Sequence, residues 1–347
     1  MKENSNIRSI CIFRLSAIGD CINALGAVQD YQKHNPQCKI TWVIGKTEYS
    51  LVKDVENINF IVFNKKDGFK GILNIRKQLK NQTFDALLHM QNSLRASIVT
   101  TVIKAKKKIG FDSYRAKDFQ TLFTNTKINQ PKSDHVLDGF IEFFCTLDPT
   151  YTRPTKKLQW NFFLSEKEQQ FGKNNTPAKT VVLTPCTSKT YKNWTTEGYI
   201  KVIKYLIDNK YNILICGGNS TLEQHIANQI ESELKSTQIV NLIGKTSLKE
   251  MVAIIKNAEF VISPDSGPVH MANACEIPVI GLYAHHSPKR VGPYYYLDLC
   301  VSVYDDILKA NNINNKNWRY RIKDEKAMEQ IKDTDVINKI KTIINNK

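Results

Sequence analysis

The stretch Val261-Ile-Ser-Pro-Asp-Ser-Gly-Pro-Val-His270 predicts a buried strand, a tight turn and a helix in immediate succession. The strand is apolar and β-branched and begins near Ala258. Turn residues follow it, and Pro268 suits the first position of a helix, where its missing N–H costs nothing. Such a turn exposes backbone N–H groups at a helix N-terminus, which favours an anion beside Ser266 and His270. A diphosphate-binding turn and a capped helix start with a core histidine both fit this stretch taken alone.

Strands and helices alternate along both halves of the chain. Short apolar runs predict strands at residues 7–13, 39–44, 59–63, 84–89 and 107–111, and again at 180–184, 212–216, 238–242, 258–263 and 278–283. Helical patterns cover residues 21–34, 71–80, 93–104, 166–171, 195–208, 221–234 and 247–257, with one long basic helix over 324–345. This alternation indicates parallel βαβ units, and therefore an α/β fold with doubly wound sheets.

The alternation is interrupted between about residues 145 and 179, where three prolines stand among polar residues. We therefore expect two Rossmann-like domains, residues 1–160 and 161–320, and a C-terminal helix in 321–347 that packs across to the first domain. Ligands of doubly wound sheets bind in the loops at the carboxyl ends of the strands. The polar clusters of the sequence fall in those loops, at residues 14–20, 89–95, 184–192, 216–220, 263–270 and 283–293.

Charge is the informative part of the composition, because 49 basic residues stand against 33 acidic ones and give a net charge of +16. This excess favours an anionic partner, although a lysine-rich genome would also produce it. The sequence shows no nucleic-acid-binding motif, so we expect no nucleic acid. No apolar run reaches about 18 residues, and the N-terminus does not resemble a signal peptide. The eight cysteines are scattered without a CxxC pair, which is typical of reduced thiols in a cytoplasmic protein.

Asp20 stands directly after Gly19, where the first helix is expected to begin. It suits either a capping carboxylate or a general base that takes a proton from an acceptor hydroxyl. The loop before it lacks the Gly-x-Gly-x-x-Gly fingerprint of dinucleotide-binding proteins, which argues against NAD. In the second half, Lys189 and Lys192 follow a strand and precede a helix. Either they are surface lysines, or Lys192, beside Trp194, neutralises a departing diphosphate without a metal.

Five motifs together resemble glycosyltransferase family 9, the ADP-heptose:lipopolysaccharide heptosyltransferases, over about residues 7–300. They are Arg14-Leu-Ser-Ala-Ile-Gly-Asp20, Phe84-Asp-Ala-Leu-Leu-His-Met-Gln91, Lys192-Asn-Trp194, Ser263-Pro-Asp-Ser-Gly-Pro-Val-His270 and Ser287-Pro-Lys-Arg-Val-Gly-Pro-Tyr294. The resemblance implies a GT-B fold with two domains facing across a cleft. It also implies an inverting transfer that needs neither a metal nor another cofactor.

The resemblance also implies roles for particular residues. The implied catalytic residues are Asp20 as general base and Lys192 at the phosphates. The implied donor-binding residues are Thr187, Ser188, Asp265, Ser266, Gly267 and His270. The implied acceptor-binding residues are Arg14, Ser16, Gln91 and Arg95. Two segments depart from the family pattern, His89-Met-Gln-Asn92 and Ala284-His-His286. The adjacent histidines do not predict a metal site, because no carboxylate or cysteine stands at ligand spacing around them.

The resemblance therefore implies an enzyme that moves heptose from ADP-heptose to the inner core of lipopolysaccharide, on an anionic, lipid-linked acceptor of the Kdo-lipid A type. We expect it in the cytoplasm, in peripheral contact with the anionic inner face of the inner membrane. Two other classes stay open. One is a non-catalytic nucleotide-binding protein of the same fold, and the other is a nucleotide-sugar epimerase or oxidoreductase.

Overall fold

The computed structural model describes residues 6–314 and 317–345. Residues 1–5, on which the expectation about a signal peptide rests, lie outside the described residues. The chain divides between Phe163 and Leu164 into two compact units, three residues after the expected boundary. No helix in the described part of the chain is both long and apolar enough to cross a membrane. All eight cysteines are free thiols.

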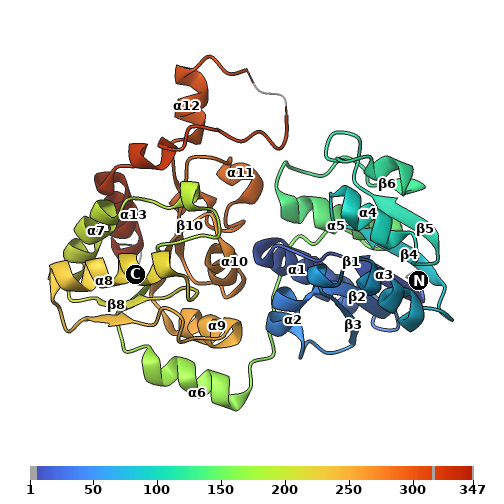
Figure 1. The fold of residues 1–347 in the computed structure, drawn as a ribbon, viewed down its shortest axis with the longest axis horizontal. Helices are drawn as coiled ribbons and strands as arrows, with labels where there is room; N and C mark the ends of the chain where they lie inside the picture. The colour runs from blue at the N-terminus through green and yellow to red at the C-terminus, as the bar shows by residue number, and fades with distance from the viewer. Residues whose placement is uncertain (1–5, 315–316, 346–347) are drawn as a thin grey trace. The chain divides into compact units, whose positions relative to one another are not determined.

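The first unit is built on one parallel sheet with the strand order β3-β2-β1-β4-β5-β6 (Figure 1). Its strands are β1 Ser9–Phe13, β2 Lys39–Gly45, β3 Ile58–Phe63, β4 Phe84–His89, β5 Ala105–Gly110 and β6 Thr126–Lys127. Its helices are α1 Ile18–His34, α2 Lys46–Val52, α3 Gly68–Gln78, α4 Leu94–Thr100 and α5 Val136–Leu147, with 3-10 turns η1 Lys65–Asp67 and η2 Gln120–Leu122. Helices α3 and α4 share one apolar core with β1 to β4, while α1 packs against α5.

The second unit repeats this winding, with the strand order β12-β11-β10-β7-β8-β9. Its strands are β7 Thr180–Leu183, β8 Asn212–Ile215, β9 Ile239–Asn241, β10 Phe260–Pro264, β11 Val279–Tyr283 and β12 Val301–Ser302. Its helices are α6 Glu166–Asn175, α7 Thr196–Asp208, α8 Thr221–Leu234, α9 Leu248–Asn257, α10 Gly267–Ala274, α11 Pro288–Val291, α12 Tyr304–Ala310 and α13 Asp333–Asn345, with 3-10 turns η3 Thr190–Lys192, η4 Leu297–Leu299 and η5 Ala327–Gln330. The expected α/β class with doubly wound parallel sheets is confirmed.

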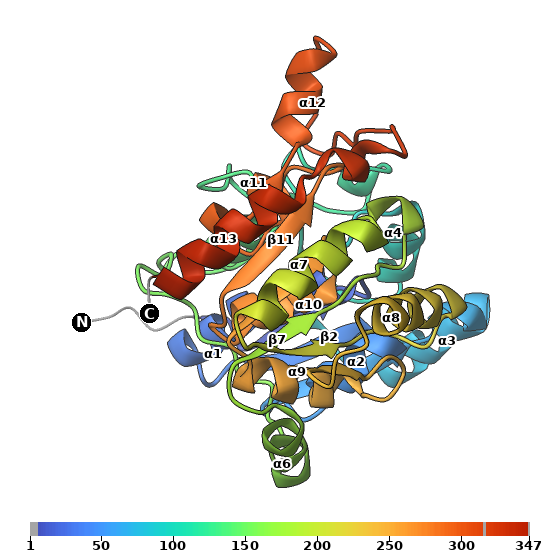
Figure 2. The ribbon, with the colours of Figure 1, turned by 90° about the vertical axis from the view of Figure 1, so that its left-hand side faces the viewer.

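The C-terminal helix is shorter than expected and belongs to the second unit. A 3-10 turn at Ala327–Gln330 precedes it, and the helix itself begins only at Asp333. Its apolar side chains Val336, Ile340 and Ile343 enter the core that α7 and α8 also cover, and α13 lies beside α7 (Figure 2). Residues 321–347 are therefore part of the second unit, and the expected contact of this helix with the first unit stays a prediction.

Several helix boundaries follow from local chemistry that the sequence displays. A capping box begins α9, since the Ser247 hydroxyl accepts from the Glu250 N–H while the Glu250 carboxylate accepts from the Ser247 N–H. Thr195 caps α7, which begins within the predicted range. Helix α5 was not predicted; it is buried nearly all round, and its buried residues include the acids Asp138 and Glu142. Its N-cap is His135, a residue that sequence rules do not favour there.

Each sheet has a switch point where its strand order reverses, between β1 and β4 in the first unit and between β7 and β10 in the second. Helices leave in opposite directions at these points, so the loops there leave room for a ligand. The loops after β1 and β4 carry residues 14–17 and 90–93, and those after β7 and β10 carry residues 184–192 and 265–266; Asp20 lies in the first turn of α1, directly after the β1 loop. Four of the five motifs singled out in the sequence therefore fall at the switch points of the two sheets, and the fifth, residues 287–294, follows the neighbouring strand β11.

Candidate functional site

Asp20 lies at the switch point of the first sheet, but it is not the capping residue of α1. Ala17 holds the N-cap position, and Asp20 is the third residue of the helix. Its carboxylate forms an ion pair with the guanidinium of Arg14 and is 32% exposed. Asp20 is thus a partly exposed carboxylate held by one cation. Its expected role as general base stays a prediction.

Arg14 makes its polar contacts within the first unit. It is mostly buried, and its Nη1 donates a hydrogen bond to the carbonyl oxygen of Met90 at 2.5 Å, while Nη2 reaches Asp20. The guanidinium lies over the ring of Phe140 at 5.4 Å. Trp42 donates its indole N–H to the Arg14 carbonyl at 3.0 Å. These contacts suit a side chain that orients Asp20, and the expected contact of Arg14 with an acceptor stays a prediction.

Gln91 joins the two loops at this switch point. Its Oε1 accepts from the backbone N–H groups of Leu15 at 3.0 Å and Ser16 at 3.3 Å. The hydroxyl of Ser16 accepts from the ammonium of Lys65 at 2.7 Å. The structure therefore brings Arg14, Ser16 and Gln91 together around Asp20. It leaves Arg95 apart, exposed on α4 with no hydrogen bond or ion pair among the described residues.

His89 belongs to the core of the first unit. It is fully buried, and its Nε2 lies 3.0 Å from the hydroxyl of Ser97. Burial, together with the nearby charge of Arg14, lowers the pKa of His89 to about 3. The ring is therefore neutral at physiological pH, and it lies in the core directly before the loop that carries Gln91.

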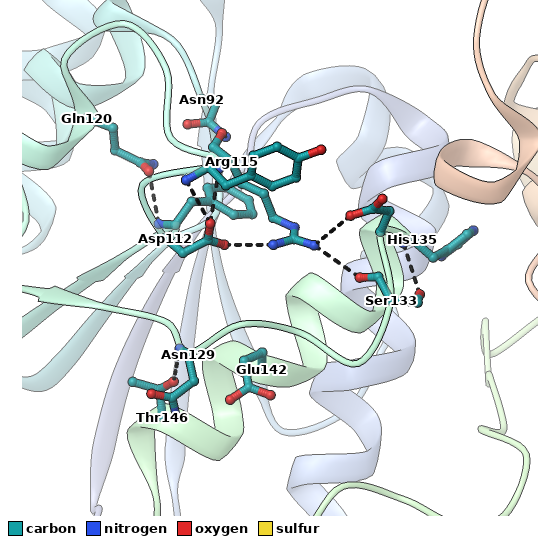
Figure 3. A network of polar contacts seen from close by, with 12 residues as sticks. Asn92, Asp112, Arg115, Gln120, Asn129, Ser133, His135, Glu142 and Thr146 are labelled. Atoms are coloured by element: carbon teal, nitrogen blue, oxygen red, sulfur yellow. Dashed lines mark hydrogen bonds and ion pairs between the residues drawn. The ribbon is translucent and has the colours of Figure 1, made fainter. Parts of the chain in front are cut away.

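A polar network around Arg115, which sequence reasoning missed, supports the same loops (Figure 3). The guanidinium of Arg115 pairs with Asp112 at 3.0 Å and donates to the carbonyl oxygen of Ser133 at 3.1 Å. Gln120 donates its amide to the carbonyl oxygens of His89 and Gln91, at 2.9 and 3.3 Å. In the sequence, the only indication that this segment belongs near the site is its position after β5, at the same edge of the sheet as the other polar loops.

In the second unit, three side chains from separate loops meet at the switch point, and we call them the Asp265 cluster. Asp265 follows β10, Lys192 ends the turn η3 after β7, and His286 follows β11. Oδ2 of Asp265 lies 2.6 Å from Nζ of Lys192 and 3.1 Å from Nδ1 of His286. All three side chains are at most 17% exposed. Sequence reasoning named Lys192 and Asp265, and it left the role of His286 open.

The charges within the Asp265 cluster are set by mutual contacts. Burial alone would raise the pKa of Asp265, but the hydrogen bond from His286 and the charge of Lys192 outweigh it, so this pKa lies well below its usual range. Burial lowers the pKa of His286, and Lys192 and Arg290 lower it further, against the opposing effect of Asp265. At neutral pH the cluster therefore holds an ammonium, a carboxylate and a neutral imidazole, and has no net charge.

The remaining expected donor-binding residues surround the Asp265 cluster in sequence. Ser266 is the N-cap of α10, and its hydroxyl lies 2.9 Å from that of Ser263. The hydroxyl of Thr187 accepts from the Lys189 N–H at 3.1 Å, so it is held within its own loop. Ser188 is exposed, and His270 is buried on α10. Gly267 is the first residue of α10. Their contacts with a donor stay predictions.

His285 ties the turn that carries Lys192 to the segment before α13. Its Nε2 lies 2.7 Å from the carbonyl oxygen of Tyr191, and its Nδ1 lies 2.8 Å from that of Ile322. Arg321 stacks over the ring of Tyr191 at 4.8 Å. His285 is 2% exposed. We therefore assign it a structural position behind the Asp265 cluster.

Two buried hydroxyl groups at the carboxyl ends of β7 and β11 have no hydrogen-bond partner among the described residues. They are Oγ1 of Thr184 and the phenol oxygen of Tyr283. Buried polar groups normally find a partner, so the strand ends beside the Asp265 cluster have unused hydrogen-bonding capacity. Among the described residues, no group of three or more His, Cys, Asp or Glu side chains could hold a metal ion. The expectation of a metal-free reaction stays a prediction.

A family model and a relative that is more than a third identical match most of the chain. The family model of glycosyltransferase family 9 (heptosyltransferase) matches residues 72–318. The lipopolysaccharide core heptosyltransferase OpsX of Haemophilus influenzae is 39% identical over 341 residues, which cover 97% of each chain.

Two solved structures show the same fold at low sequence identity. A glycosyltransferase family 9 protein from Veillonella parvula superposes with a TM-score of 0.79 at 18% identity, covering 100% of this chain and 99% of its own. The heptosyltransferase WaaC of Escherichia coli, solved with ADP, superposes with a TM-score of 0.75 at 20% identity, covering 96% and 99%. At these sequence identities the two structures support the fold alone, whereas the family model and the similarity to OpsX support membership of the family.

Proposed function

Since this chain belongs to glycosyltransferase family 9 and is a glycosyltransferase, we propose that it transfers heptose from ADP-heptose to the inner core of lipopolysaccharide. The observation that carries the proposal is the Asp265 cluster at the switch point of the second sheet, where a fixed ammonium stands beside the start of α10. The names of OpsX, a lipopolysaccharide core heptosyltransferase, and of WaaC, solved with ADP, support the choice of substrates.

The donor site is proposed at the Asp265 cluster. A nucleoside diphosphate is a flexible polyanion, and it needs positive groups that do not have to rearrange when the sugar leaves. Asp265 holds Lys192 in place, and the positive N-terminal end of the α10 dipole adds a second favourable group. These groups allow the diphosphate to depart without a metal ion. The transfer is therefore proposed to be metal-independent.

The proton acceptor is proposed to be Asp20. As the acceptor hydroxyl forms its bond to the anomeric carbon, its proton passes to the carboxylate of Asp20, and the bond from that carbon to the diphosphate oxygen breaks. Attack opposite the leaving group inverts the anomeric configuration. Arg14 is a positioning residue in this scheme, because it holds Asp20 from a buried site. Ser16 and Gln91 hold the same loop.

The acceptor is proposed to be reached at an anionic membrane surface, on the cytoplasmic face of the inner membrane. Helices α3 and α4 cover the same face of the first sheet and expose apolar side chains to solvent, namely Phe69, Leu73, Leu94 and Ile98. Lysines 65, 66, 70 and 77 stand among or beside the apolar residues of α3, and all four are exposed. Exposed apolar groups flanked by lysines favour peripheral binding to anionic lipids.

The test is a transfer assay in EDTA with ADP-heptose and a Kdo-lipid A acceptor, with parallel calorimetric titrations of ADP, UDP, GDP and NAD. We expect ADP to bind in preference to the others, and we expect a heptosylated lipid of inverted configuration with equimolar ADP. Preference for UDP or GDP would contradict the proposed donor. Binding of ADP without turnover on any acceptor would favour the non-catalytic alternative, and tight binding of NAD would favour the oxidoreductase.

A further inference from the structure

His286 has one ring nitrogen engaged and one available. An ionised carboxylate only accepts hydrogen bonds, so the contact between Asp265 and Nδ1 of His286 at 3.1 Å requires the proton on Nδ1. In the neutral ring this leaves a lone pair on Nε2. Nε2 makes no hydrogen bond within the described residues, and the side chain is 16% exposed. The ring is therefore held in one orientation with its second nitrogen unused.

The charged groups around His286 come from three elements. Asp265 follows β10, Lys192 ends η3, and Arg290 lies on α11. The positive charges of Lys192 and Arg290 disfavour a proton on Nε2, whereas the carboxylate of Asp265 favours one. That carboxylate already forms an ion pair with Lys192, with 2.6 Å between Oδ2 and Nζ. A diphosphate placed at the Asp265 cluster would add two or more negative charges on the side of the two cations. The balance that keeps His286 neutral would then reverse.

We propose that His286 takes up a proton when the nucleoside diphosphate binds, and that its Nε2–H then donates a hydrogen bond to a phosphate oxygen. This inference rests on the proposed donor site and adds a further contact group to it. The proton comes from solvent on binding and returns to solvent when the diphosphate leaves, so no other reactant is needed. Lys192 and the imidazolium together would then stabilise the departing diphosphate.

Proton uptake makes binding depend on pH in a defined direction. Free His286 has a lowered pKa, and a bound anion beside the ring should raise it. Between those two values each bound ADP takes up as much as about one proton, and affinity falls as the pH rises, by up to about tenfold per pH unit. Below the lower value and above the higher one, this contribution to the pH dependence disappears.

The experiment is calorimetric titration of the full chain with ADP at pH 7 in PIPES, HEPES and Tris buffers, whose ionisation enthalpies differ. The slope of the observed enthalpy against the buffer enthalpy gives the number of protons taken up. His286→Asn is the informative variant, because its amide occupies the place of Nδ1 and can still donate to Asp265, but nothing replaces Nε2. His225→Gln, on the exposed side of α8, is the control.

We expect the wild type and His225→Gln to take up the same number of protons, and His286→Asn to take up fewer by as much as about one. The protonation of ADP itself cancels in this difference. Affinity for ADP should fall roughly tenfold to a hundredfold in His286→Asn, as for a lost hydrogen bond to a charged group. His286→Gln, which places its amide near Nε2, should recover part of the affinity and none of the proton uptake.

Equal proton numbers in the wild type and both His286 variants would overturn this inference while leaving the donor site intact. A wild-type chain that binds no ADP at all would overturn the donor site and this inference together. Circular dichroism of each variant shows whether it is folded, and the two His286 variants check each other.

Discussion

The replacement of Lys192 by alanine tests the donor site most directly. In the structure its ammonium lies 2.6 Å from Asp265, and both side chains are less than a fifth exposed. A phosphate about 4 Å from that ammonium would gain about 4 kcal/mol at an effective dielectric constant of about 20. Screening by the solvent that reaches the site lowers this figure. We therefore expect Lys192→Ala to lose about 3–4 kcal/mol of transition-state stabilisation, roughly 10²- to 10³-fold in kcat/KM.

Part of this loss should come from Asp265 rather than from the missing cation. Without Lys192 a mostly buried carboxylate faces the incoming diphosphate, and like charges repel. The double variant Lys192→Ala/Asp265→Asn removes that repulsion and should recover activity relative to Lys192→Ala. Additive effects of the two changes would show that they do not share an anion.

The assay is the steady-state release of ADP from ADP-heptose with a lipopolysaccharide acceptor, in EDTA. Lys189→Ala is the matched control, because Lys189 is exposed in the same loop and has no ion pair among the described residues. We expect the control to stay within about twofold of the wild type, as surface charges contribute little. If Lys192→Ala retained more than a third of the wild-type kcat/KM, Lys192 would not contact the diphosphate and the donor site would have to be sought elsewhere.

Three further predictions follow from the geometry. Asp20→Asn should keep ADP affinity in calorimetry and lose about 10²- to 10⁴-fold in kcat, as for the loss of a general base; a large loss of ADP binding would contradict this role. Gly45→Ala should lower both the melting temperature and the activity, because the added Cβ would lie 2.3 Å from the carbonyl oxygen of Leu15, in the loop before Asp20. Gly139→Ala is the control: the nearest atom to its added Cβ is 3.8 Å away, so this change should be neutral or stabilising. Phe69→Ser should reduce sedimentation with anionic vesicles without changing kcat on a soluble acceptor; unchanged sedimentation would remove α3 from the membrane surface.

Much of the fold could be predicted from the sequence, because its strands are short, apolar and regularly separated by amphipathic helices. Phe84–His89 and Thr221–Leu234 have the predicted boundaries, because turn residues or a capping serine mark their ends. The first helix begins at Ile18 rather than Cys21, so the predicted loop is shorter than expected and Asp20 lies within the first helical turn. A helix start without a capping side chain gives no sequence signal.

The buried parts of the first unit were the hardest to predict. Asp138 and Glu142 lie on α5 and are almost fully buried, yet both pair with Arg153, which is 15 and 11 residues further along. A sequence shows such acids as polar positions, which weakens the apolar pattern of the helix around them. Only the tertiary pairing makes their burial tolerable. Helix α5 was therefore missed for a physical reason, since its ion pairs cannot be seen locally.

The candidate sites, too, could be predicted as far as local sequence determines them and not where they depend on contacts between distant residues. The polar loops could be found from the sequence, because each follows a predicted strand, and parallel strands place their carboxyl ends at one edge. Which side chains meet could not be found, since Lys192 and Asp265 are 73 residues apart and Asp265 and His286 are 21 apart. The strand order β11-β10-β7 decides it, because it places the three loops side by side. His286 follows β11 and therefore reaches Asp265, so a histidine that looked like an isolated departure in the sequence is built into the charge balance of the proposed donor site.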